Sequence, residues 1–177
     1  MRPPEAFSFT CPMKVNCGSH ALTTIPNELV ALGAGAPLLL VNRNQTGKKQ
    51  LKAVVGAFQG SQMVLGIYDR VTELTAPDGL MSLAQIYKGG GHDCIIAVGS
   101  GPVVDVSKCL NLLVSTTNAV DWQDAVRHIA DPEPLQPLML VSAAGGSGYE
   151  ATGHVRLGGR RLCSLRLAPD VAFIDPA

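Results

Sequence analysis

Short apolar runs alternate with longer amphipathic segments along most of the chain. The apolar runs, which have the length and continuous character of strands buried on both faces, cover residues 38–41, 64–68, 94–98 and 138–141. Between them, apolar residues recur at spacings of three and four in the segments 51–58, 80–87 and 103–113. This alternation predicts an α/β domain, a Rossmann-like parallel sheet covered by helices on both faces.

The two ends of the chain depart from this pattern. Residues 13–16 and the region 155–167 look like edge strands or a hairpin. We therefore expect an edge β-hairpin beside the parallel sheet. The length, 177 residues, suits one α/β domain over residues 1–177.

Composition and charge narrow the classes of protein. Hydrophobic residues make up 46% of the chain and charged residues 16%, which fits a largely buried sheet. Fourteen basic and fourteen acidic residues cancel, so no basic field is available for nucleic acid or a membrane surface. No segment approaches the roughly 18 apolar residues of a membrane span, and the N-terminus lacks an apolar signal core. These features predict a cytoplasmic protein with no nucleic-acid or membrane partner.

The five cysteines form no CxxC pair, and their number is odd. Cys94 and Cys109 lie within apolar runs. We expect the cysteines to be buried free thiols in a reducing compartment. The four histidines are scattered at spacings that build no metal site.

The first candidate for chemistry is the turn Gly99-Ser100-Gly101-Pro102, between an apolar strand and a helix. A glycine-rich turn at the end of a parallel strand exposes backbone N–H groups, and the following helix directs its positive end to the same place. Pro102 suits the first helical turn, where its missing N–H costs nothing. The turn could bind a phosphate, or it could be a tight connection that binds nothing.

A second glycine-rich turn follows the strand at 138–141. Its residues Gly146 and Gly148, with Ala151, nearly match the dinucleotide fingerprint G-x-G-x-x-G/A. The match lies late in the chain and lacks an acidic residue at the end of the next strand, so we reject the ordinary Rossmann assignment. We keep the prediction that the two turns lie at one edge of the sheet and line one crevice.

Asp105 and Lys108 lie three residues apart on the helix after the first turn. They could form a plain helical ion pair. Alternatively, Asp105 lies in the first helical turn and faces the ligand crevice.

Four segments, in order and at the right spacing, resemble one known family. Residues 95–108, IIAVGSGPVVDVSK, are similar to the iron-type (group III) alcohol dehydrogenase motif I-A-[VI]-G-G-G-S-x-x-D-x-[AC]-K. Residues 141–152, VSAAGGSGYEAT, align without gaps on that family's I-P-T-T-A-G-T-G-S-E-x-T. Residues 169–176 match its P-x-x-[AV]-x-x-D-P, and residues 12–18 resemble its opening strand.

The resemblance implies a dehydroquinate synthase-like N-terminal domain that binds NAD or NADP. In that family a helical C-terminal domain holds Fe²⁺ or Zn²⁺ through one Asp and three His. The metal polarises the alcohol or carbonyl oxygen while the nicotinamide exchanges hydride. The family's first metal ligand lies beyond the closing D-P, so Fe²⁺ or Zn²⁺ is expected only if a C-terminal domain exists.

Carried over position by position, the resemblance outlines a cofactor site with altered phosphate turns. The candidate cofactor-binding residues are Arg43, Gly99, Ser100, Gly101, Pro102, Asp105, Ala143, Ala144, Gly146 and Arg161. Ser100 replaces the middle glycine of the first motif, and Pro102 replaces its phosphate-binding serine, which removes a hydroxyl and an N–H. Ala143 and Ala144 replace two threonines, each of whose hydrogen bonds is worth roughly 0.5–1.5 kcal/mol. Together those two changes weaken binding by about one to two powers of ten.

Two arginines bear on the type of cofactor. Arg43 lies where the family often has an aspartate on the adenosine ribose, and a cation there could meet a 2′-phosphate. This favours NADP over NAD, unless the site has drifted and binds neither. Arg161 is the best match for a family lysine near the adenine.

The resemblance leaves three interpretations open. The first is the nucleotide-binding half of an NAD(P)-dependent alcohol/aldehyde oxidoreductase, which is not catalytic alone. The second is a degenerate, non-catalytic interaction or scaffold module. The third is half of an enzyme with a sister activity in the same superfamily, such as a glycerol or polyol phosphate dehydrogenase. Without the helical partner an apolar face would be uncovered, so we also expect a homo-oligomer or association with a helical domain.

Overall fold

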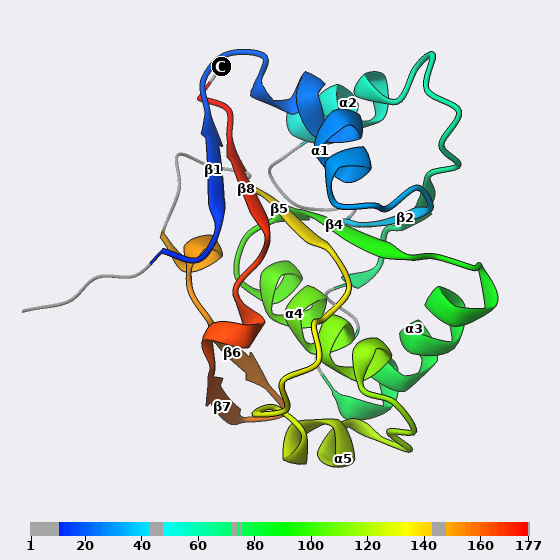
Figure 1. Cartoon of the computed structure of the whole chain (residues 1–177), viewed down its shortest axis with the longest axis vertical. Helices are drawn as coiled ribbons and strands as arrows, with labels where there is room; N and C mark the ends of the chain where they lie inside the picture. Colours follow the sequence, from blue (N-terminus) through cyan, green and yellow to red (C-terminus); the bar gives the residue numbers. More distant parts are fainter. Residues whose placement is uncertain (1–10, 43–47, 72–73, 75, 143–147, 177) are drawn as a thin grey trace, which may run out of the picture.

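A computed structural model describes residues 11–42, 48–71, 74, 76–142 and 148–176. Its main sheet has six parallel strands in the order β1-β8-β5-β4-β2-β3 (Figure 1). The strands are β1 (Lys14–Cys17), β2 (Pro37–Leu40), β3 (Gly66–Tyr68), β4 (Cys94–Gly99), β5 (Leu138–Ser142) and β8 (Val171–Ile174). The α-helices are α1 (Ile25–Ala31), α2 (Lys48–Ala57), α3 (Pro77–Gly89), α4 (Pro102–Ser115) and α5 (Trp122–Arg127). The 3₁₀ helices are η1 (Ala21–Thr24), η3 (Tyr149–Ala151) and η4 (Leu165–Leu167).

The helices cover both faces of the sheet, and the strand side chains alternate between them. Leu38 and Leu40 of β2 pack in one core cluster with α3 and α4, whereas Leu39 packs in the other with α1 and α2. The central strands β4 and β5 are buried along their whole length. Because both faces are covered, these strands are apolar throughout, and the predicted parallel α/β architecture is confirmed.

The strand order reverses between β2 and β4. From β2 the chain steps outward to β3, and α3 then returns it across β2 to β4. The later strands β5 and β8 step in the opposite direction. In open α/β sheets, ligands bind at the carboxyl ends of the strands beside such a reversal. This reversal puts the end of β4 in the centre of the candidate site.

The predicted hairpin is present as β6 (His154–Leu157) and β7 (Arg160–Cys163), but it does not extend the main sheet. The two strands pair only with each other and pack beside α4 (Figure 1). The predicted edge strand near residue 14 is confirmed as β1. The pattern did not indicate α1, α5 or the strand β8, which lies between β1 and β5.

The cysteine prediction is right for two residues and wrong for three. Cys94 and Cys109 are buried, whereas Cys11, Cys17 and Cys163 are exposed, and all five are free thiols. Cys17 and Cys163 lie on an edge strand and on the hairpin, where one side of the strand faces solvent.

No helix in the described part of the chain is long and apolar enough to cross a membrane.

Candidate functional site

The turn from β4 into α4 depends on glycine at two positions. Gly99 has a φ of 153° and Gly101 a φ of 48°, values that other residues rarely adopt. Pro102 is the first residue of α4, where its missing N–H leaves no intrahelical bond unmade. The side chain of Ser100 is exposed between the two glycines. The turn therefore presents backbone and the positive end of a fourteen-residue helix to the sheet edge.

The second glycine turn begins at the same edge of the sheet. Gly99 at the end of β4 pairs with Ser142 at the end of β5, so the chain leaves both strands side by side. The candidates Ala143, Ala144 and Gly146 follow directly but lie outside the described residues, as does Arg43 after β2. The shared edge supports the prediction that one crevice serves both turns.

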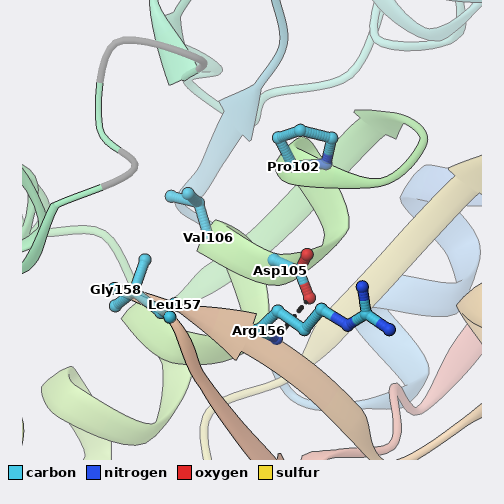
Figure 2. A pocket seen from close by; sticks show the side chains of 7 residues that line it. Pro102, Asp105, Val106, Arg156, Leu157 and Gly158 are labelled. Carbon is cyan, nitrogen blue, oxygen red and sulfur yellow. Dashed lines mark hydrogen bonds between the residues drawn. The ribbon is translucent and has the colours of Figure 1, made fainter.

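A pocket of about 340 Å³ lies between the first turns of α4 and the β6–β7 hairpin (Figure 2). It is lined by Pro102, Asp105, Val106, Arg156, Leu157, Gly158 and Gly159. Thus two of the candidate residues, Pro102 and Asp105, line the pocket, and Gly99, Ser100 and Gly101 lead into it. Arg161 is the second residue of β7. Its side chain is exposed and does not line the pocket. The pocket wall that the hairpin supplies was not foreseen from the sequence.

Asp105 ties α4 to the hairpin rather than to its own helix. Its Oδ1 accepts a hydrogen bond of 2.7 Å from the backbone N–H of Arg156 (Figure 2) and another from the Tyr149 hydroxyl. Burial, and then this contact with Asp105, raise the pKa of the Tyr149 hydroxyl well above its usual value. Asp105 lines the pocket, and its Oδ1 already accepts the two hydrogen bonds that hold the hairpin.

Lys108 also connects α4 to the segment that leads into the hairpin. Its main contacts are backbone carbonyls, and not the Asp105 side chain with which a helical ion pair was considered. Its side chain is completely buried, and Nζ donates to the carbonyl oxygens of Tyr149 (3.3 Å), Thr152 and His154 (3.2 Å). Nζ also lies 5.1 Å from the centre of the Tyr149 ring. Burial lowers the pKa of Lys108 to about 8, although Asp105 partly opposes this shift.

The base of the hairpin closes through a contact that only glycine permits. A Cβ on Gly153 would lie 1.9 Å from the carbonyl oxygen of Ser164. The backbone N–H of Ser164 also donates to the carbonyl of Gly153 over 3.0 Å. Gly153 thus lets the two ends of the hairpin meet beside the carbonyls that Lys108 binds.

Replacing Tyr149 with phenylalanine is expected to lower the free energy of unfolding by about 1–2 kcal/mol, because it removes a hydrogen bond to a carboxylate. Tyr87→Phe is the matched control. The Tyr87 hydroxyl is buried and has no hydrogen-bond partner within the described residues, so its removal should cost nothing. Urea unfolding of both variants measures the difference; equal losses would contradict the role given to the Tyr149–Asp105 bond.

Among the described residues, no group of three or more His, Cys, Asp or Glu side chains could hold a metal ion. The described site offers groups suited to binding an anion: backbone N–H groups, a helix N-terminus and the arginines of the hairpin.

A doubly wound sheet with a glycine-rich turn at its point of strand reversal defines an open α/β domain, a class in which ligands bind at this edge of the sheet. The model of the iron-containing alcohol dehydrogenase family matches residues 12–176. The chain belongs to that family, as its four motifs predict.

Similar curated proteins are longer. The chain is 28% identical over 173 residues to the mitochondrial hydroxyacid-oxoacid transhydrogenase of Xenopus tropicalis, and 23% identical over 175 residues to that of Homo sapiens. Each alignment covers 92% of this chain but 37% of the relative. The chain thus spans little more than a third of the length of these relatives.

Solved structures share the fold. The NADH-dependent butanol dehydrogenase A of Thermotoga maritima superposes with a TM-score of 0.80 at 22% identity, covering 97% of this chain and 44% of that one. The sulfoacetaldehyde reductase of Bifidobacterium kashiwanohense, solved in complex with NAD⁺, gives a TM-score of 0.76 at 16% identity, covering 97% and 46%. At these identities the likeness concerns the fold alone.

Proposed function

We propose that this chain is the nucleotide-binding part of an NAD(P)-dependent, metal-containing alcohol dehydrogenase, and that it is not catalytic alone. The observation that carries the proposal is the pocket at the first turn of α4, which lies beside the point where the strand order of the sheet reverses. The chain's membership of the iron-containing alcohol dehydrogenase family gives this pocket its expected ligand. When bound, the nicotinamide supplies hydride transfer. The described residues contribute binding and orientation.

The shape of the turn suits a phosphate, but its donors are fewer than in the family motif. A Cβ on Gly101 would meet nothing within 4 Å, so this part of the turn is open to a ligand. Pro102 offers neither an N–H nor a hydroxyl at the helix start. Ser100 adds a side chain where the backbone should approach a phosphate. Weak cofactor binding follows, with NADP preferred because of Arg43.

Titration of the chain with NADPH and with NADH, followed by nucleotide fluorescence, tests this proposal. We expect weak binding, tighter for NADPH, with slower amide hydrogen exchange in the first turn of α4 and in the hairpin. An Arg43→Gln variant should lose the preference for NADPH, whereas Arg127→Gln, at an exposed arginine on α5, should keep it. Absence of binding at millimolar nucleotide would overturn the cofactor proposal for this chain, and tighter NADH binding would overturn the role of Arg43.

A second candidate is a non-catalytic interaction or scaffold module, favoured by the loss of donors at Ser100 and Pro102. It predicts no nucleotide binding together with stable association. The nucleotide titration separates the two candidates. We propose self-association of the chain in either case, and light scattering tests that proposal.

A further inference from the structure

The solvent side of the β6–β7 hairpin carries a cluster of four reactive or charged side chains. Strand register pairs His154 with Cys163 and Arg156 with Arg161. All four are exposed, whereas Val155, which lies between the two pairs on β6, is buried. Because side chains alternate along a strand, the four share one face.

Within this cluster, the Cys163 thiol lies beside a base. Its Sγ is 3.7 Å from Nε2 of His154, within hydrogen-bonding distance for sulfur. A thiol is nucleophilic as the thiolate, and an adjacent imidazole can take the proton. The pair is therefore arranged for reaction at sulfur.

The backbone of strand β6 is fixed by two hydrogen bonds to α4. Lys108 binds the carbonyl of His154, and Asp105 binds the N–H of Arg156. These bonds hold strand β6 in place, and the pairing of β6 with β7 keeps the thiol opposite the imidazole. The other exposed thiols, Cys11 and Cys17, have no such imidazole contact among the described residues.

The charge of the same face selects a reaction partner. The backbone positions of Arg156 and Arg161 lie two residues along the strands from the His154–Cys163 pair, about 7 Å away on the same face. Positive charge on this face attracts anionic reagents. A small disulfide that carries carboxylates matches this surface better than a neutral or cationic one.

We propose that Cys163 is a modification site that forms a mixed disulfide with small, carboxylate-bearing disulfides. The Cys163 thiol passes its proton to Nε2 of His154, and Sγ attacks one sulfur of the reagent. The new Sγ–S bond forms as the reagent's S–S bond breaks. The departing thiolate takes the proton from the imidazolium and leaves as a thiol. Cys163 is oxidised, half of the reagent is reduced, and no other reactant is needed.

Peptide mass spectrometry of the full chain, after timed exposure to oxidised glutathione, measures the reaction at each cysteine. We expect Cys163 to react about tenfold faster than Cys11 or Cys17. His154→Gln and His154→Asn should remove most of this advantage, whereas His128→Gln, at a half-buried histidine that follows α5, should leave it unchanged. Equal rates at the three exposed thiols, or a full advantage in both His154 variants with unchanged thermal unfolding, would overturn the proposal.

The charge preference has its own test with cystamine, a disulfide that carries ammonium groups. Arg161→Gln should slow the reaction of Cys163 with oxidised glutathione severalfold without slowing that with cystamine. Equal slowing with both reagents, or no slowing with either, would overturn the proposed selection of anionic disulfides. Because no nucleotide is present, neither result depends on the proposed cofactor site.

Discussion

Replacing Lys108 with methionine is expected to lower the free energy of unfolding by about 3 kcal/mol or more. Methionine keeps the length and the buried apolar stem but leaves the carbonyls of Tyr149, Thr152 and His154 without their shared donor. The Tyr149 carbonyl keeps the hydrogen bonds that it accepts from the N–H and the hydroxyl of Thr152. The cost therefore comes chiefly from the carbonyls of Thr152 and His154, which lose a charged donor at a buried position. The hairpin should also loosen, so its amide protons should exchange faster than those of β4 and β5.

Urea unfolding at pH 7 measures the loss, with Lys88→Met as the matched control. Lys88 is exposed near the end of α3, so the same substitution there should cost less than about 0.5 kcal/mol. A similar small loss at Lys108 would show that its three hydrogen bonds contribute nothing net.

The free energy of unfolding of the wild type and that of Lys108→Met should also depend differently on pH. The pKa of Lys108 falls from 10.5 to about 8 on folding, so between these values the unfolded chain holds a proton that the folded chain has released. The part of stability that depends on Lys108 therefore rises with pH from about 8 to 10.5. Burial raises the pKa of Cys94 and of Cys109, which acts in the opposite direction once unfolded thiols ionise.

Lys108 is thus isolated by the difference between the wild type and Lys108→Met, since both carry the two thiols. That difference should widen from pH 8 to pH 10.5. A difference that stays constant over this range would contradict the lowered pKa.

The sheet and its main helices could be predicted because their signals are local. The continuous apolar run at β4 and the three-four spacing of α4 depend on burial within each element. The turn between them was recognised from Gly99, Gly101 and Pro102, whose backbone preferences are local too. The strand predicted over residues 64–68 is shorter in the structure. β3 begins at Gly66, and Val64 lies outside the sheet with its side chain exposed.

Elements with short or borderline signals were missed. β8 has four residues, which periodicity cannot separate from a loop, and its place between β1 and β5 is set by long-range pairing. α5 has six residues, and its clearest signal was the capping of its N-terminus by Asp121, which accepts from the N–H of Asp124 over 2.8 Å.

The hairpin wall of the pocket shows where local reasoning ends. Spacing alone suggested that Asp105 pairs with Lys108, three residues away. In the fold both side chains instead reach residues 149–156, more than 40 positions later. Likewise, the contact between His154 and Cys163 depends on strand register, and no spacing rule would have paired them. The parts of the site that the sequence could not reveal are those made by tertiary contact.

Restoring the family residues at the α4 turn, with Ser100→Gly and Pro102→Ser together, is expected to tighten NADPH binding about ten- to hundredfold. Serine at position 102 returns an N–H and a hydroxyl at the positive end of α4, where both can donate to a phosphate. Glycine at position 100 lets the phosphate approach the backbone between Gly99 and Gly101, and it removes no contact, since the Ser100 side chain is exposed.

Pro26→Ser is the matched control, because Pro26 also lies in the first turn of a helix but on α1, across the sheet from α4. The control should bind NADPH as the wild type does, so a gain in both proteins would point to a general effect of losing proline. A gain confined to the double variant, together with slower amide exchange at the start of α4, would mean that the turn still has the shape of a phosphate site and lacks only donors. No gain in a double variant that unfolds like the wild type would place the defect elsewhere, and would favour a non-catalytic module over a weakened cofactor site.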